Sequence, residues 1–266
     1  MARIHPTAIV EAKAAQIADD VEIGAMAYVG PDVKIGPGCK LLPQCHVTGY
    51  TTMGANNTVY PFASLGTPAE DFAFEGGKTY LRIGDGNIFR EGVTVNTGTK
   101  PDTETVIGNR CFLMANVHVA HNCILGNNVI LVVGAGLSGY VTIFDRAFVS
   151  GLTGIHQFCR VGRLAMLSGG SVFSKDIPPF MTAEGRNGGV KMVNLVGLKR
   201  AGISDEAIRA LRDVHRIFFR LGLNTTNAIE QIKAEVPLLP EVKEFLDFCE
   251  SSERGVLQNR IAGKRS

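Results

Sequence analysis

Tryptophan is absent from the 266 residues, and all aromatic residues together make up only 7% of the chain. A core built around large aromatic clusters is therefore excluded, and the 31 glycines favour narrow, repetitive packing instead. An excess of charge is also missing, because 27 basic and 25 acidic residues leave a net charge of +2. The overall charge thus gives no reason to expect a nucleic-acid partner.

Long hydrophobic runs are missing as well. The longest stretch free of polar residues, Val129–Leu137, has nine residues, two of them glycine, whereas a membrane span needs about 20. The segment Met1–Pro6 lacks the apolar stretch of a signal peptide, and the six cysteines form no CxxC pair. We therefore expect a cytoplasmic protein with free thiols and no stable membrane insertion.

Apolar residues recur every six positions, in three blocks that share one phase. This period is neither the 3.6 of a helix nor the 2 of a strand. It is typical of the hexapeptide repeat of a parallel β-helix, in which three flat segments and three corners make a triangular coil of 18 residues. The residues are Ile17, Ile23, Val29, Ile35, Leu41, Val47, Met53, Val59, Leu65, Ile83, Phe89, Val95, Ile107, Leu113, Val119, Leu125, Leu131, Leu137, Ile143, Val149, Ile155, Val161 and Leu167.

Each periodic side chain is predicted to point into the coil, and the glycines that follow many of them are expected to relax the backbone near the corners. Coils should stack about 4.8 Å apart. The pattern breaks at 67–82 and 96–106 but resumes in phase, so both stretches are predicted to be loops that leave the solenoid. We expect the β-helix to occupy residues 1–185.

The repeat fades after Phe173, and residues 186–266 are predicted to form a separate helical domain. One helix should begin after Ser204, which is a good N-cap and is followed by acidic residues. Two more are predicted over 226–236 and 240–251. This part holds 14 basic and 10 acidic residues, so it suits an acidic partner or a diphosphate, although an ordinary solvated helix surface explains the charge equally well.

Three of the six histidines are predicted to lie on one side of the solenoid. His118 and His121 flank Val119, and His156 follows 35 residues after His121, one short of two coils. Imidazoles in such a group serve as a general base, as metal ligands or as phosphate contacts. The spacing alone leaves these three uses open.

Four motifs give the sequence a specific resemblance. They are NVHVAHNC (116–123), GIHQFC (154–159), DIPPF (176–180) and VNLVGLKRAGIS (193–204). Together they resemble the acyl-carrier-protein:UDP-N-acetylglucosamine O-acyltransferases of lipid A synthesis, over nearly the whole chain. The resemblance implies a left-handed parallel β-helix with a C-terminal α-helical domain, assembled as a homotrimer with active sites between neighbouring solenoids.

The resemblance also implies a mechanism. His121 matches the general base that takes the proton of the sugar 3-hydroxyl, which then attacks the thioester of a (R)-3-hydroxyacyl chain on acyl carrier protein. The backbone N–H of Gly139 matches the group that stabilises the oxyanion. No metal and no cofactor is implied beyond the phosphopantetheine of the carrier protein. The positions that match substrate-binding residues are Asp71, His118, Tyr140, His156, Gln157, Gly169, Asn194 and Arg200.

The chain departs from this family at four positions. Better-known members carry histidine at Tyr140, a basic residue at Ala73, an acidic residue at Asn122 and a second arginine at Ala201. A less basic pocket leads to an alternative hypothesis, in which the acceptor is a 3-amino analogue of the nucleotide sugar and the product is an amide.

Other readings of the repeat remain open at this point. The N-acyltransferase of the third step of the pathway carries an extra N-terminal domain, whereas here the repeat has begun by Ile17. A γ-type carbonic anhydrase needs zinc held by histidines of adjacent chains, and the histidine spacing does not match it. A non-catalytic binding solenoid is the third possibility.

Overall fold

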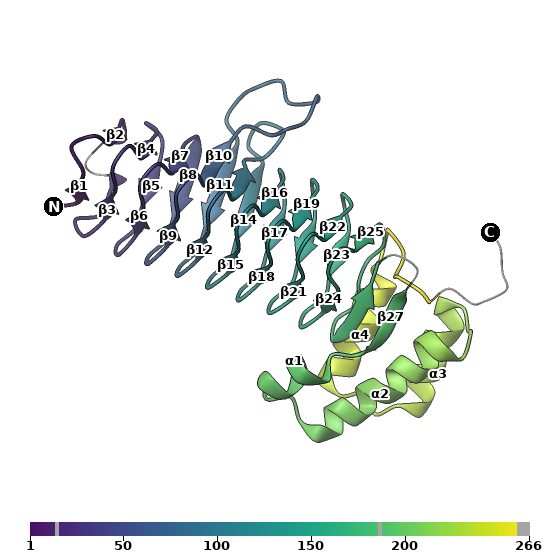
Figure 1. The fold of residues 1–266 in the computed structure, drawn as a ribbon. Coiled ribbons are helices and arrows are strands. Elements are labelled where there is room, and N and C mark those ends of the chain that lie inside the picture. The colour runs from purple at the N-terminus through teal and green to yellow at the C-terminus, as the bar shows by residue number, and fades with distance from the viewer. Residues whose placement is uncertain (14–15, 186–187, 260–266) are drawn as a thin grey trace.

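The computed structural model describes residues 1–13, 16–185 and 188–259. Figure 1 shows a long solenoid of stacked coils, with helices at the end opposite the N-terminus. Three sheets, here called A, B and C, run along the solenoid, and each inner strand of the coils pairs with the strand one coil before and one coil after it. The fold is thus a left-handed parallel β-helix with a C-terminal helical part, as predicted.

Most strands of the three sheets are two residues long, because each side of the triangle is short. Sheet A contains, in spatial order, β1 (Arg3–Ile4), β3 (Glu22–Ile23), β6 (Lys40–Leu41), β9 (Thr58–Val59), β12 (Ile88–Phe89), β15 (Phe112–Leu113), β18 (Ile130–Leu131), β21 (Phe148–Val149), β24 (Met166–Leu167), β26 (Met181–Glu184) and β27 (Gly189–Val193). Sheet B contains β2 (Ile9–Val10), β4 (Tyr28–Val29), β7 (His46–Val47), β10 (Ser64–Thr67), β13 (Thr94–Asn96), β16 (His118–Val119), β19 (Gly136–Leu137), β22 (Gly154–Ile155) and β25 (Val172–Phe173). Sheet C contains β5 (Lys34–Ile35), β8 (Tyr50–Met53), β11 (Tyr80–Ile83), β14 (Glu104–Ile107), β17 (Ile124–Leu125), β20 (Thr142–Ile143) and β23 (Arg160–Val161).

The core of the solenoid is built from two inward positions per side of the triangle. All the periodic residues predicted to point inward are at most 9% exposed, and each full burial of such a side chain contributes roughly 1.5–3 kcal/mol. The residue two places earlier is also buried, as Val117 and Cys123 illustrate. The sequence analysis missed this second position because small and polar residues share it with apolar ones.

The glycines of the repeat have a different role from the predicted one. Gly84 and Gly108 follow periodic residues but do not adopt a positive φ. A Cβ on Gly84 would lie 2.8 Å from the carbonyl oxygen of Gly108 in the next coil. These glycines therefore allow close approach of coils, and the left-handed corner conformation falls two residues later, on residues such as Arg110 (φ 54°).

Two excursions leave the solenoid beside sheet B (Figure 1). They cover 68–79, between β10 and β11, and 97–103, between β13 and β14. Both are shorter than the predicted 67–82 and 96–106, because the flanking strands extend to three or four residues. The hydroxyls of Thr79 and Thr97 lie 2.7 Å apart, and Asn96 Nδ2 donates to the carbonyl of Pro68 at 2.9 Å. The bases of the two excursions are thereby tied together.

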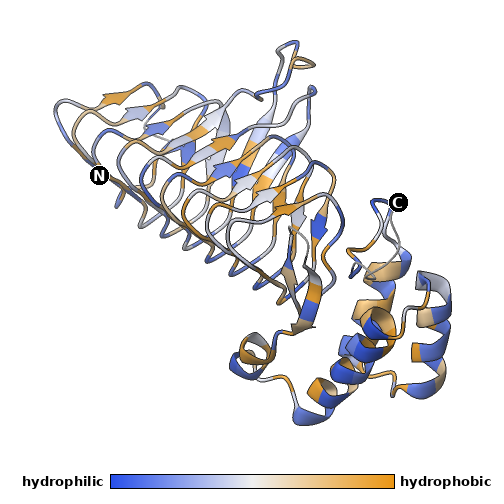
Figure 2. Cartoon of the chain, turned by 45° about the vertical axis from the view of Figure 1, so that its right-hand side comes forward, coloured by the Kyte–Doolittle hydropathy of each residue, from blue (hydrophilic) through white to orange (hydrophobic). Residues whose placement is uncertain are grey.

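Among the described residues, the C-terminal part contains four helices, α1 (Leu195–Arg200), α2 (Asp205–Arg220), α3 (Thr225–Glu235) and α4 (Pro240–Glu250). The Ser204 side chain caps α2 by accepting from the N–H of Ala207, as the sequence predicts. The helices are two-sided, with hydrophobic and hydrophilic residues both present (Figure 2), and their apolar faces form a second core. In the part of the chain that the structure describes, no helix is long and apolar enough to span a membrane.

The junction between solenoid and helices is continuous. Strands β26 and β27 pair antiparallel across the boundary predicted after residue 185, and β26 pairs with β24 of the solenoid. Residues 186–187 and 260–266 of the predicted helical domain lie outside the described residues. Behind the hairpin, the buried Asp176 carboxylate accepts hydrogen bonds from Arg160 Nε and Ser252 Oγ, both at 2.8 Å. The segment after α4 is thus fixed to the last coil.

The burial of all six cysteines gives a prediction about thiol reactivity. Burial raises the pKa of the Cys45 and Cys123 thiols to about 12 and that of Cys111 to about 11. Since the thiolate is the reactive form, we expect an aromatic disulfide reagent at pH 8 to label almost no thiol in the native protein and all six after denaturation. Rapid labelling of several thiols without unfolding would contradict the packing described here.

Candidate active site

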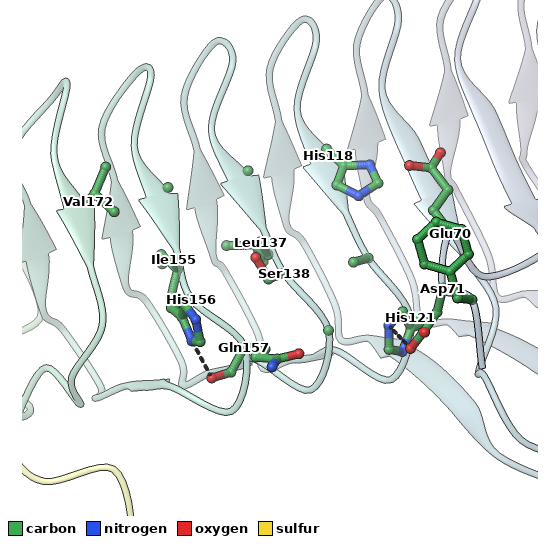
Figure 3. Close-up of a pocket in the computed structure, with 15 residues that line it drawn as sticks. Glu70, Asp71, His118, His121, Leu137, Ser138, Ile155, His156, Gln157 and Val172 are labelled. Atoms are coloured by element: carbon green, nitrogen blue, oxygen red, sulfur yellow. Dashed lines mark hydrogen bonds and ion pairs between the residues drawn. The ribbon is translucent and has the colours of Figure 1, made fainter. Parts of the chain in front are cut away.

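A cavity of about 570 Å³ opens on the outer face of sheet B, beneath the first excursion. The strands β16, β19, β22 and β25 supply its floor, and residues 70–72 of the excursion supply one wall (Figure 3). The lining residues are Glu70, Asp71, Phe72, His118, Ala120, His121, Gly136, Leu137, Ser138, Gly139, Gly154, Ile155, His156, Gln157 and Val172. Five of the predicted site side chains therefore lie in one cavity: Asp71, His118, His121, His156 and Gln157.

His121 sits at the corner that follows β16 and is only 6% exposed. Gly139, one coil further on, allows this burial. A Cβ on Gly139 would lie 2.4 Å from Cε1 and 2.6 Å from Nε2 of the imidazole, so any side chain there would displace the ring. In the part of the chain that the structure describes, the N–H of Gly139 donates to no other group.

The hydrogen bonds of Asn122 determine which nitrogen of His121 is basic. Asn122 Oδ1 accepts from the backbone N–H of Thr99 at 3.0 Å, which identifies this atom as the oxygen. The same oxygen lies 3.0 Å from His121 Nδ1. Nδ1 is therefore the protonated nitrogen, and Nε2 is the nitrogen that can accept a proton.

Asp71 approaches this basic nitrogen from the excursion. Its Oδ2 lies 3.3 Å from His121 Nε2, and its Oδ1 accepts from the N–H of Ala73 at 2.9 Å. The second bond closes a local turn, which holds the carboxylate in the excursion. When His121 is protonated, its Nε2–H can donate to Asp71. When Nε2 is unprotonated, it can instead accept a hydrogen bond from the hydroxyl of a molecule that enters the cavity.

The other two histidines lie on either side of the same cavity. His118 Nδ1 lies 2.8 Å from Thr94 Oγ1, and burial lowers the pKa of His118, so this ring stays neutral near pH 7. His156 is exposed, and its Nδ1 lies 3.2 Å from both the Gln157 carbonyl oxygen and Arg254 Nη2. The segment after α4 thus reaches the edge of the cavity.

Tyr140 takes a place beside His121 rather than in the cavity wall. Its ring meets the imidazole edge to face, with centroids 5.4 Å apart, and stacks on Phe158 at 4.9 Å. The Tyr140 ring, which packs on Phe158, thus covers one side of the His121 imidazole with an uncharged group.

The structure places the remaining predicted residues elsewhere in the single chain. Asn194 and Arg200 line a second cavity, of about 720 Å³, beside sheet A and α1. Asn194 also caps α1 by accepting from the N–H of Gly197 at 3.0 Å. Gly169 lies at a corner, where a Cβ would be 3.3 Å from the carbonyl oxygen of Gly151. One chain therefore does not bring these three residues to His121.

Several lining residues escaped the sequence analysis. Glu70 and Phe72 adjoin Asp71, and only the broken repeat pointed to their excursion. Val172 reads as an ordinary strand residue. Arg254 does not line the cavity but contacts His156 at its edge, and it was also missed because it lies far along the chain. Among the residues described, no three histidine, cysteine, aspartate or glutamate side chains are placed to hold a metal ion.

Comparison with known families defines the class of protein first. Residues 14–49 and 104–139 match the model for the bacterial transferase hexapeptide (six repeats). Residues 176–257 match the model described as Udp N-acetylglucosamine O-acyltransferase, domain 2. The repeat and the C-terminal part together indicate a hexapeptide-repeat acyltransferase.

Relatives of full length narrow this class. The acyl-[acyl-carrier-protein]–UDP-N-acetylglucosamine O-acyltransferase of Stutzerimonas stutzeri is 40% identical over 96% of this chain and 99% of its own. That of a Janthinobacterium species is 43% identical over 97% and 100%. The crystal structure of the UDP-N-acetylglucosamine acyltransferase of Bacteroides fragilis matches with a TM-score of 0.88 at 38% identity, covering 96% of this chain and 97% of that one. The chain belongs to the acyl-[acyl-carrier-protein]–UDP-N-acetylglucosamine O-acyltransferase family.

The contact between Gly139 and His121 predicts a large effect of one methyl group. In Gly139→Ala, the new Cβ would collide with the imidazole, so we expect the turnover number to fall at least roughly 100-fold, the share that a general base contributes. The matched control is Gly151→Ala, whose Cβ meets no atom closer than 3.2 Å. Equal activity of both variants in a steady-state transfer assay would contradict this account.

The role of Asn122 is tested by two substitutions that both tolerate its positive φ of 59°. Asn122→Gly removes the oxygen that orients His121, and we expect the turnover number to fall roughly 10- to 100-fold. Asn122→Asp keeps an acceptor for both N–H groups and should retain most of the activity. Unchanged kinetics in the glycine variant, with an unchanged melting temperature, would exclude an orienting role.

Proposed function

We propose that this protein transfers a (R)-3-hydroxyacyl chain from acyl carrier protein to the 3-hydroxyl of UDP-N-acetylglucosamine, the first step of lipid A biosynthesis. The observation that carries the proposal is the buried His121 imidazole, whose Nε2 faces an open cavity next to an unpaired backbone N–H. The names of the full-length relatives supply the two substrates.

In this mechanism His121 Nε2 takes the proton of the sugar hydroxyl as the oxygen attacks the thioester carbon. The N–H of Gly139 donates a hydrogen bond to the carbonyl oxygen as negative charge develops there. Collapse of the tetrahedral intermediate breaks the carbon–sulfur bond, and the proton on His121 passes to the leaving thiolate. Asp71, His118, His156 and Gln157 line the space where the sugar and the donor would meet.

The reaction written this way needs no metal and no cofactor in the protein, because the donor brings its own phosphopantetheine. We place it in the cytoplasm, where acyl carrier protein is loaded. The six free cysteines suit a reducing compartment.

We also propose that the working form is a homotrimer. Two features support it. Asn194 and Arg200 lie at the second cavity and would reach His121 only from a neighbouring copy. Along sheet A, the outward-facing residues of the first coils are charged, whereas those of the later coils are apolar and follow one another without interruption. These apolar residues are Ile88, Phe112, Ile130, Phe148 and Met166. Such a column favours burial against another chain.

The negative charge of the cavity lining supports a second candidate for the sugar that accepts the acyl group. Its lining includes the carboxylates of Glu70 and Asp71 but neither lysine nor arginine. Lys78, a cation of the first excursion, lies over the Tyr50 ring instead, and Arg254 contacts His156 only at the edge of the cavity. An acceptor with a 3-amino group in place of the hydroxyl would be attracted to these carboxylates, and its acylation would give an amide.

The test is a transfer assay with purified protein, (R)-3-hydroxyacyl carrier protein and each of the two nucleotide sugars. We expect an acylated nucleotide sugar in the product mass spectrum. His121→Ala should lose nearly all turnover while keeping the oligomeric state of the wild type in analytical ultracentrifugation.

The outcomes separate the parts of the proposal. Faster turnover of the hydroxyl acceptor supports the ester, and faster turnover of the amino acceptor supports the amide. Full activity of His121→Ala would contradict the assignment of His121 as the general base. A monomer at assay concentrations would contradict the proposed trimer.

A further inference from the structure

The segment that follows α4 lies along the last coil like an additional strand. Its backbone pairs in parallel with that of Asp176. The Asp176 N–H donates to the carbonyl oxygen of Gly255 at 3.0 Å, and the Leu257 N–H donates to the carbonyl oxygen of Asp176 at 2.8 Å. Ser252 Oγ also donates to the buried Asp176 carboxylate at 2.8 Å. Because these bonds lie on both sides of Arg254, they hold that residue at a fixed place against the solenoid.

Arg254 directs its guanidinium to the edge of the cavity. Its Nη2 lies 3.2 Å from Nδ1 of His156 and 3.4 Å from the carbonyl oxygen of Ser174. Its Nε is buried and has no hydrogen-bond partner among the described residues. Arg160 and Arg163 each pair with a carboxylate, whereas Arg254 has no ion pair in the part of the chain that the structure describes. Its principal side-chain partner is therefore an imidazole.

The two contacts of His156 Nδ1 require different protonation of this nitrogen. The carbonyl oxygen of Gln157 also lies 3.2 Å from Nδ1, and Figure 3 shows this contact beside the cavity. A carbonyl oxygen can only accept a hydrogen bond, and the guanidinium of Arg254 can only donate one. Nδ1 is protonated in the first contact and unprotonated in the second, so the contacts belong to different tautomers of the neutral ring.

The contact with Arg254 favours the tautomer whose Nδ1 is unprotonated. A hydrogen bond from a charged donor is about twice as strong as one between neutral groups, and a nearby positive charge opposes a second proton on the ring. Lys175 adds a positive charge at this corner, and the Asp176 carboxylate is already bonded to Arg160. The proton of the neutral His156 ring therefore resides on Nε2.

We propose that Arg254 is a positioning residue, which keeps the proton of His156 on Nε2 and so makes this histidine a hydrogen-bond donor to the nucleotide sugar. The inference rests on the proposed function and adds a residue that prepares the binding of the acceptor. His156 lines the cavity, and its Nε2 has no hydrogen-bond partner among the described residues. The hydroxyl and phosphate oxygens of a nucleotide sugar accept from such a donor.

The tautomer can be measured directly by nuclear magnetic resonance of protein with nitrogen-15-labelled histidine at pH 8. The His156 signals are identified by their loss in His156→Gln. The wild type should show a ring protonated on Nε2. In Arg254→Met, which keeps a long side chain but has no donor, part of the ring population should carry its proton on Nδ1, where the Gln157 carbonyl accepts it. Arg254→Lys keeps a charged donor and should restore most of the wild-type pattern.

The matched control is Lys175→Met, which removes a positive charge from the same corner. Among the described residues, no hydrogen bond joins Lys175 to His156, so the histidine spectrum should equal that of the wild type. The melting temperature of each variant is measured alongside, to separate a change of tautomer from a loss of folding.

Steady-state kinetics then test the consequence for the substrate. In Arg254→Met, the KM for the nucleotide sugar should rise roughly three- to tenfold, the share of one hydrogen bond, while kcat stays within about twofold because His156 does not touch the reacting atoms. The side-chain amide of His156→Gln offers an N–H whatever the state of residue 254. Adding Arg254→Met to this variant should therefore change KM little.

The possible results are distinct. A proton shift in Arg254→Met, with a KM increase that is absent in the His156→Gln background, supports the proposal. A wild-type ring protonated on Nδ1 overturns it without any variant. A wild-type spectrum of Arg254→Met also overturns it, as does a KM increase of equal size in the His156→Gln background, which would mean that the arginine acts on the substrate itself. If the wild type transfers no acyl chain, the proposed function fails, while the spectra still decide whether Arg254 sets the tautomer.

Discussion

The structure depends on the close stacking of coils around a core that is one or two side chains wide. Because successive coils of the regular repeat hydrogen-bond in the same register, residues separated by 18 positions become neighbours across about 4.8 Å. This constraint aligns the residues at equivalent positions of successive coils in columns along the solenoid. It places Gly139 against His121, and it leaves the excursions free to vary, since they begin and end in phase with the repeat.

The cavity follows from the same constraint applied to one face. A corner residue, His121, becomes buried because the neighbouring corner carries a glycine and because an excursion from two coils earlier places Asp71 over it. Asn122 then fixes the ring through one oxygen shared with the backbone of Thr99. Three segments remote in sequence thus meet at one imidazole.

Much of the fold could be predicted from the sequence, because a six-residue period of apolar residues has few physical interpretations. The second inward position could not, since alanine, cysteine, asparagine and threonine all fit it and carry no common hydrophobic signal. Helix α1 was also missed, as six residues give too short a pattern to detect. The three histidines were placed on one side from their spacing alone. Gly136 and Gly154 gave no signal, because glycine in a repeat is expected at a corner. Asn194 and Arg200 lie at a second cavity beside sheet A, which the sequence motif alone does not place.

The two ends of the solenoid differ in a way that affects how chains meet one another. At the C-terminal end, the hairpin β26–β27 and the helices cover the last coil. At the N-terminal end, β1 and β2 are the edge strands of sheets A and B in the part of the chain that the structure describes. These edges are only two residues long, and Arg3 and Glu22 form an ion pair beside one of them. Short, charged edges are poor templates for further strands. End-to-end stacking of solenoids into fibres is therefore disfavoured at both ends, by the short edge strands at one end and by the hairpin and helices at the other.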